Sequence, residues 1–121
     1  MGAVTFFYIL NATMLLLHEM ESAYEKEWEI LKLPGHISGF LLLHVPILLL
    51  LLYGAVEMEK QSQIGMVLGI ISGIGGLIPF LAHKILVKRK DQFNLVLSNI
   101  IIYGNILTGI AVLVLSIRCF L

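Results

Sequence analysis

The stretch from His18 to His44 reads HEMESAYEKEWEILKLPGHISGFLLLH, and it joins two long apolar runs. It holds three of the four histidines, whereas most of the remaining chain is Leu, Ile, Val and Gly. Leu33-Pro34-Gly35 ends the helical pattern within it, because proline lacks the amide donor that a helix needs and glycine permits a tight reversal. The stretch therefore predicts two helices joined by a polar connection.

The composition of the chain is that of a protein dissolved in lipid. Of its 121 residues, 59% are hydrophobic and 13% are charged, and the mean hydropathy is +0.96. Soluble domains are nearer a quarter charged. The formal net charge is zero, which gives no indication of a nucleic-acid partner, and the single Cys119 excludes an internal disulfide.

Apolar runs of nearly 20 residues recur along the chain, and this length lets a helix cross a bilayer. They predict four spans in one domain covering 1–121, at about 3–20, 37–56, 64–87 and 93–118. The expected fold class is all-α, an integral membrane antiparallel four-helix bundle. No Lys or Arg precedes the first run, so we expect a true span there rather than a cleavable signal peptide.

The connection after the first span has a helical pattern of its own. Tyr24, Trp28 and Leu31 recur at helical spacing, and aromatic rings of this kind favour the headgroup layer. We expect an interfacial helical extension, either straight or bent onto the membrane surface. The charged residues around it, Glu27 among them, are typical of a solvated helix face.

Small residues in the third run indicate close helix packing. Gly65, Gly69 and Gly73 follow GxxxG spacing and Gly76 follows them, and such residues let two backbones approach in lipid. Gly65, Gly69 and Gly76 share a helix face with Ser72 and His83. The fourth run carries Asn94, Ser98, Asn105 and Thr108 on one face, which is expected to point into the bundle.

The distribution of Lys and Arg predicts the orientation. Six of the eight lie in the first and third connections, and the remaining two, Lys60 and Arg118, lie on the other side. Because cytoplasmic loops carry the excess of Lys and Arg, both termini are expected outside the inner membrane.

Polar residues from separate spans are expected at similar depth. Because the spans alternate in direction, His18, His44 and His83 fall in the cytoplasmic half, and Glu21 lies one turn beyond His18. Ionisable groups at membrane depth are costly and mark function by default. Histidine with carboxylate is a ligand set for zinc and non-haem iron.

These residues predict a metal site. Its ligands would be His18, Glu21, His44 and His83, with Glu25 as an outer ligand or proton carrier, and with Asn94 and Ser98 as supporting polar groups. An open metal position could activate water or oxygen for chemistry on a hydrophobic small molecule. Whether the protein is an enzyme stays open at this point.

Other interpretations fit the same residues. The histidines could be structural hydrogen-bonding groups, and His36, beside Pro34 and Gly35, a solvated loop residue. The chain could be a proton-coupled transporter acting as a homo-dimer, with Glu21 or His18 as the coupled group. It could hold haem b between two of the three inner histidines, or dock a partner protein through Gly65–Gly76.

The first hairpin also resembles a known family pattern. The pattern begins with His18, Glu21, Tyr24, Glu27 and Trp28 and continues with Leu33-Pro34-Gly35. It then includes Phe40, Leu41, Leu42, His44 and Pro46, and it closes with Tyr53 and Gly54. This pattern is similar to that of a family of small, uncharacterised bacterial membrane proteins. The resemblance implies a four-helix membrane fold in the bacterial inner membrane and no established activity. On a regular helix Glu27 would lie opposite His18, so the helix-face argument and the family pattern disagree about Glu27.

Overall fold

The computed structural model describes residues 2–86 and 95–121, and within them it is helical without a strand. The elements are α1 (Ala3–Tyr24), α2 (Glu27–Ile30), α3 (His36–Glu59), α4 (Gln63–Gly75), α5 (Ile78–Phe80), the π-helical segment η1 (Leu81–Leu86) and α6 (Val96–Phe120). Four helices in this part of the chain are long and apolar enough to cross a membrane: Ala3–Tyr24, His36–Glu59, Gln63–Ile85 and Val96–Phe120. The predicted all-helical chain with four long apolar helices is confirmed.

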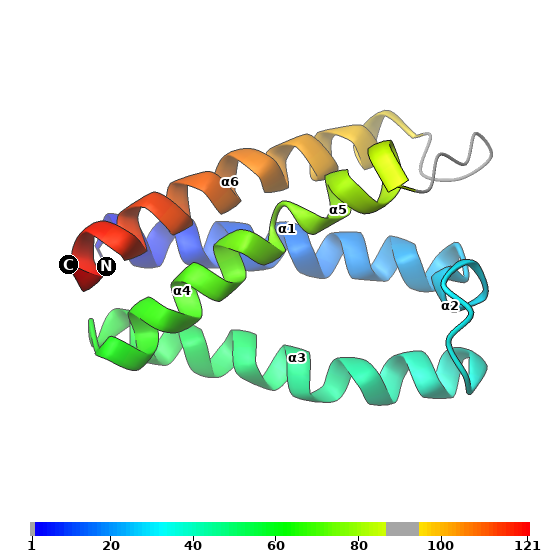
Figure 1. The fold of residues 1–121 in the computed structure, drawn as a ribbon, viewed down its shortest axis with the longest axis horizontal. Helices are drawn as coiled ribbons and strands as arrows, with labels where there is room; N and C mark the ends of the chain where they lie inside the picture. The colour runs from blue at the N-terminus through cyan, green and yellow to red at the C-terminus, as the bar shows by residue number, and fades with distance from the viewer. Residues whose placement is uncertain (1, 87–94) are drawn as a thin grey trace.

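The four long helices run antiparallel to their neighbours in sequence, so both termini lie at one end of the molecule and α2 lies at the other (Figure 1). α6 packs against α1 and α4, and α3 packs against α4 and α1. A hydrophobic core of Val4, Tyr8, Met58, Met66 and Val112 lies toward the end that carries the termini. From there α3 and α4 diverge toward the α2 end and form the two sides of a wedge (Figure 1).

Glycines bring the backbones of α4 and α6 into contact. A Cβ at Gly73 would lie 2.8 Å from the carbonyl oxygen of Gly109 and 2.9 Å from the amide nitrogen of Leu113. Gly69 lies against Ser116 of α6, and Gly65 lies against the backbone at the end of α3. Gly76 lies against Asn11 of α1 and the carbonyl of Asn105. Each of the four glycines singled out in the sequence therefore has backbone or side-chain atoms where a Cβ would stand.

Asn11 joins three helices through its buried amide. Its Nδ2 donates to the carbonyl oxygen of Ser72 on α4 at 2.9 Å, and Thr108 of α6 donates its hydroxyl to Oδ1 at 3.0 Å. The side chain of Asn11 is completely buried. Ser98, Asn105 and Thr108 are buried on the inner face of α6, as their spacing predicts. Asn11 therefore ties α1 to α4 and to α6.

The third long helix is interrupted, whereas the sequence predicted one continuous helix over 64–87. α4 ends at Gly75, and α5 begins two residues after Gly76 with Pro79 in its first turn. Proline lacks an amide hydrogen and cannot continue the hydrogen-bond ladder of a preceding helix. The chain then widens into the π-helical segment η1, which carries His83. This interruption changes the direction in which the last part of the span presents its side chains.

Gly73→Ala tests the contact between α4 and α6. The added methyl group meets backbone atoms that cannot move independently, so the free energy of unfolding should fall by about 1–3 kcal/mol. Gly75→Ala is the matched control, because a Cβ there meets only Leu15 Cδ1 at 4.0 Å. Denaturation in mixed micelles with increasing SDS measures both variants. Equal stability of the two variants would contradict the close contact between α4 and α6.

Asn11→Ala tests the junction of three helices. It removes two hydrogen bonds between helices, and each such bond contributes about 0.6 kcal/mol in membrane proteins. The free energy of unfolding should therefore fall by about 1–2 kcal/mol. Thr13→Ala serves as control, since the Thr13 hydroxyl donates to the carbonyl oxygen of Ile9 in its own helix. The same SDS titration compares them, and a Thr13 variant as unstable as the Asn11 variant would argue against the junction.

Candidate metal centre

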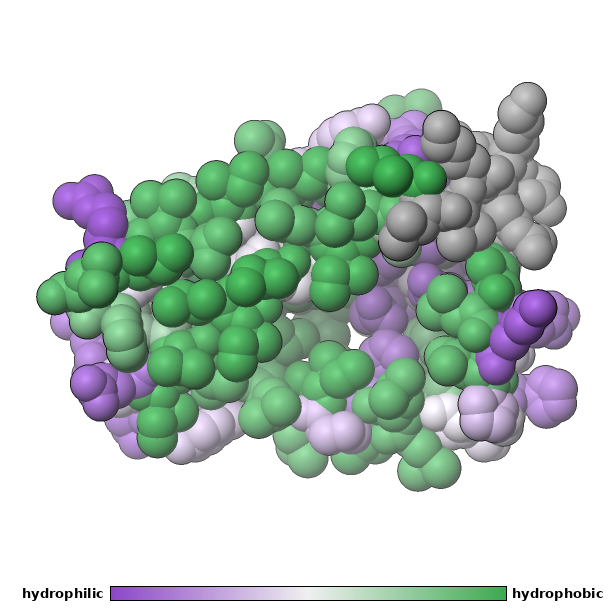
Figure 2. Space-filling model, viewed as in Figure 1, coloured by the Kyte–Doolittle hydropathy of each residue, from purple (hydrophilic) through white to green (hydrophobic). Residues whose placement is uncertain are grey.

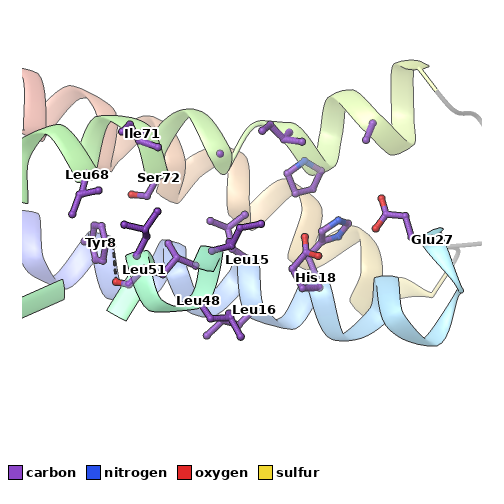
Figure 3. A pocket seen from close by; sticks show the side chains of 17 residues that line it. Tyr8, Leu15, Leu16, His18, Glu27, Leu48, Leu51, Leu68, Ile71 and Ser72 are labelled. Atoms are coloured by element: carbon purple, nitrogen blue, oxygen red, sulfur yellow. Dashed lines mark hydrogen bonds between the residues drawn. The ribbon is translucent and has the colours of Figure 1, made fainter. Parts of the chain in front are cut away.

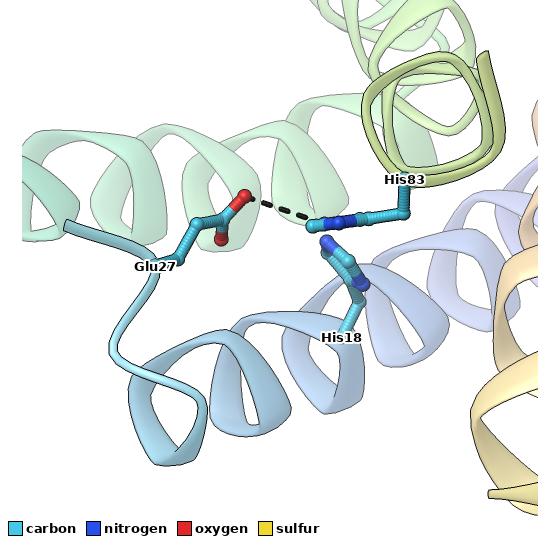
Figure 4. Close-up of side chains that lie close together, drawn as sticks. All are labelled: His18, Glu27 and His83. Atoms are coloured by element: carbon cyan, nitrogen blue, oxygen red, sulfur yellow. Dashed lines mark ion pairs between the residues drawn. The ribbon is translucent and has the colours of Figure 1, made fainter. Parts of the chain in front are cut away.

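A break in the helix after α1 determines where Glu27 lies. Lys26 has φ 54° and ψ 50°, the left-handed region, and α2 begins directly after it. Non-glycine residues rarely adopt this conformation, because Cβ then approaches a carbonyl oxygen. The turn carries Glu27 off the line of α1 and back over it, so that its carboxylate points toward His18 and His83 (Figure 4). The regular helix that would have put Glu27 opposite His18 does not extend this far.

His18, Glu27 and His83 form a compact group, which we call the triad. Glu27 Oε1 lies 3.3 Å from His83 Nε2, and the rings of His18 and His83 have centroids 4.9 Å apart (Figure 4). One ligand atom from each residue lies within 4.8 Å of the other two. The residues come from α1, α2 and η1, and their side chains are largely buried.

The donor set of the triad fits zinc or non-haem iron. Two imidazoles and one carboxylate are the protein ligands of one class of catalytic zinc site, and the same set binds ferrous iron in oxygenases. Ligand bonds of 2.0–2.2 Å place neighbouring ligand atoms about 3.4 Å apart in a tetrahedron. His83 and Glu27 already have that spacing, and rotation of the His18 ring could close the remaining gap. Three protein ligands leave a fourth position for water or substrate.

The environment of Glu27 keeps its carboxylate ionised. Burial alone raises the pKa of Glu27, but hydrogen bonds from His83 and Ser22 outweigh it and hold the pKa below its ordinary value. Ser22 also lies 3.4 Å from Nε2 of His18. An ionised carboxylate beside two imidazoles is the protonation state that a divalent metal requires of its ligand.

An apolar cavity of about 340 Å³ adjoins the triad (Figure 3). His18, Glu19 and Glu27 line one end of it, and aliphatic side chains such as Leu15, Leu48 and Ile71 line most of the rest. It lies between α1, α3 and α4, where the helices diverge, and the space-filling view shows a hollow between the side chains of α4 and α3 (Figure 2). A molecule bound in this cavity would have its polar end at the triad.

The region just described falls within a recognised protein family. A model with the description "Family of unknown function (DUF6713)" matches residues 4–119. The chain belongs to the DUF6713 family. No curated protein and no solved structure matches the chain. The match confirms the expectation of an uncharacterised family, and it covers all four long helices of this DUF6713 member rather than the first hairpin alone.

In this DUF6713 protein only part of the predicted ligand set converges. His18 and His83 meet at the triad. Glu21 instead accepts a hydrogen bond from Ser98 of α6. His44 pairs through Nε2 with Glu19 at 2.6 Å, and its Nδ1 lies 2.7 Å from the carbonyl oxygen of Phe40.

The remaining predicted residues lie elsewhere. Glu25 is in the turn between α1 and α2, and Asn94 lies outside the described residues. Ser98, which was expected to support the metal site, contacts Glu21. His36 is exposed at the start of α3, where the sequence suggested a solvated loop residue.

Sequence reasoning missed Glu27 as a site residue and did not consider Glu19. Glu27 was assigned to a solvated helix face, although the family pattern contained it together with His18 and Glu21. Glu19 follows His18 directly, so on a helix the two side chains point in different directions. Helical spacing therefore gives no indication that Glu19 lies near the site. Only the position of His44 on the facing helix reveals its role.

Substitutions of Lys26 test the turn that positions Glu27. Lys26→Gly should preserve the free energy of unfolding or raise it by up to about 1 kcal/mol, because glycine adopts the left-handed region freely. Lys26→Val should lower it by about 1–2 kcal/mol, because a branched Cβ is strained there. Trp28, the single tryptophan, adjoins Glu27 and reports the transition by fluorescence. A valine variant as stable as the glycine variant would contradict the left-handed turn.

Proposed function

We propose that the protein spans the bacterial inner membrane as an antiparallel four-helix bundle and binds zinc or non-haem iron at His18, Glu27 and His83. The observation that carries this proposal is the convergence of the three residues. They come from separate segments of the chain, and the side chains of Glu27 and His83 are only 11% and 7% exposed. Buried ionisable groups are costly in a helical membrane protein unless they are paired or hold a ligand.

The local backbone supports the same proposal. Lys26 has a left-handed conformation immediately before Glu27, and His83 lies in a π-helical segment. Both are uncommon local structures that are found disproportionately at functional sites. Each of them orients one member of the triad toward His18 (Figure 4).

The proposed orientation puts the triad on the cytoplasmic side. The α2 end carries Lys26, Lys32 and Lys84 among the described residues, while Lys60 and Arg118 lie near the opposite end. Under the positive-inside rule, the α2 end is cytoplasmic and both termini are outside. The metal would then be reached from the cytoplasm or through the hollow between α3 and α4.

The arrangement suits chemistry on an apolar substrate. Three protein ligands would leave a bound metal ion with a coordination position to spare, and the ion would supply Lewis acidity to an oxygen of a bound molecule or to water. The protein's own groups exclude bulk water with aliphatic side chains and keep Glu27 ionised. Glu19, paired with His44 at the same end of the cavity, provides a second polar group facing the bound molecule.

Elemental mass spectrometry tests the proposal. The protein is purified in detergent with an affinity tag that contains no histidine, and it is expected to hold close to one zinc or iron ion per chain. His18→Ala and Glu27→Gln should each lower the metal affinity at least about 100-fold, since loss of a mere outer-shell partner costs about 10–100-fold. Circular dichroism and size-exclusion chromatography confirm that the variants are folded.

Glu21→Gln is the matched control for Glu27→Gln. Both replace a glutamate on the α2 side of the bundle, but Glu21 is bonded to Ser98 and not to the triad. Glu21→Gln should therefore retain the metal. A loss of metal in both variants would contradict this ligand set. A metal-free wild-type protein after incubation with zinc or ferrous iron would remove the proposal, and a Soret absorption band would replace it with haem binding.

A further inference from the structure

We infer that the cavity beside the triad holds one acyl chain of a membrane lipid, with the polar end of the lipid at His18 and Glu27. This inference rests on the proposed function, because it assigns the substrate class of the same site. It is carried by the distribution of polar groups along the cavity, by the dimensions of the cavity and by its lateral opening.

The two hydroxyl groups at the deep end of the cavity donate their hydrogen bonds within the protein. They are those of Tyr8 and Ser72. The Tyr8 hydroxyl donates to the carbonyl oxygen of Leu51 at 2.8 Å (Figure 3). The Ser72 hydroxyl donates to the carbonyl oxygen of Gly69 at 3.1 Å. Both donors are thus already used within the protein. The occupant of this end is therefore expected to be a hydrocarbon.

The opposite end is polar and lies at the level where a lipid has its own polar groups. His18, Glu19 and Glu27 line the cavity there, and Glu27 belongs to α2, outside the candidate membrane spans. The cavity thus runs from an interfacial polar end toward the apolar middle of the bundle. A lipid in the adjacent leaflet is likewise polar at the interface and apolar toward the middle of the bilayer.

The size and lining of the cavity favour a single flexible chain. Tyr8 and His18 are ten residues apart on α1, which corresponds to about 15 Å along the helix axis. A volume of 340 Å³ accommodates on the order of ten groups the size of water or methylene. Among the described residues that line it, the aromatic rings are those of Tyr8 and His18, one at each end, and none lies along the walls between them. The walls are mainly leucine and isoleucine, which pack against an alkyl chain without orienting it.

The cavity is also open in the direction from which a lipid would arrive. α3 and α4 are in contact near the end that carries the termini and diverge toward α2. Hydrophobic side chains border most of the hollow between them, and hydrophilic ones border it on the α2 side (Figure 2). On α3 the side chains of Leu41, Leu42 and Leu49 are exposed, as expected of a helix that faces acyl chains. A chain could enter sideways while the headgroup of the lipid stays at the interface.

Photolabelling in nanodiscs of phosphatidylcholine tests the inference. The probe is a palmitic acid analogue with a diazirine in the middle of its chain, and labelled peptides are mapped by mass spectrometry. We expect saturable labelling of Leu15, Leu48 and Ile71 that unlabelled palmitate suppresses. Labelling confined to exposed residues such as Leu42 and Leu49, without saturation, would overturn the inference.

Gly75→Leu blocks the cavity without disturbing helix packing. Gly75 lines the cavity, and a Cβ there meets only Leu15 Cδ1 at 4.0 Å, so the leucine side chain projects into the cavity. It displaces about two methylene groups of a bound chain, and the affinity for the probe should fall about tenfold. Gly104→Leu is the matched control: its Cβ meets only the flexible end of Met14 at 3.6 Å, and Gly104 does not line the cavity. Equal labelling of the two variants would overturn the inference.

Metal analysis of the same samples separates the two proposals. Wild-type protein that holds metal but shows no saturable labelling would overturn the lipid inference and leave the metal site standing. Wild-type protein that is labelled saturably but holds no metal would overturn the proposed function and leave the cavity as a lipid-binding site. Gly75→Leu is expected to lose the probe and keep the metal, because the triad residues are unchanged in it.

Discussion

The buried amide of Asn11 is the interaction on which the arrangement of the other helices depends. It bonds Ser72 on α4 and Thr108 on α6 from one side chain on α1, at a place where glycines let the helices approach. In the membrane location proposed for this bundle, lipid would offer no hydrophobic force to hold helices together, and close packing and hydrogen bonds between helices would have to do so. With α1, α4 and α6 joined in this way, α3 is the helix left to diverge.

The position of α3 explains why the protein has a cavity. Tyr8 bonds the carbonyl of Leu51, and the hydrophobic core near the termini holds α3 against its neighbours at that end. At the other end α3 is tied through α2, where Trp28 packs on Phe40, and through the pair of Glu19 and His44. Between these two attachments the side chains do not fill the wedge, and an apolar space adjoins the triad.

Two departures from regular helix orient the triad. Lys26 takes a left-handed conformation and turns Glu27 back over α1, and the interruption at Gly75–Pro79 followed by a π-helical segment turns His83 toward His18. Each carries a conformational cost that regular helices would avoid, and such costs are commonly met at functional sites. The geometry of the site is therefore determined by local breaks rather than by the straight parts of the helices.

The sequence by itself determined the four long apolar helices, the turn at Pro34 and Gly35, and the placing of His18 and His83 at the same level of the bundle, because the length and order of the apolar runs can be read along the chain. It could not determine the third member of the triad. Helical spacing makes Glu21 the expected neighbour of His18, but Glu21 bonds Ser98 of α6. The left-handed backbone at Lys26 brings Glu27 to the triad instead. Whether a polar side chain faces the triad, α6 or α3 depends on contacts between segments that are distant in the sequence. Only the tertiary structure therefore decided that Glu21 meets Ser98 and that His44 meets Glu19.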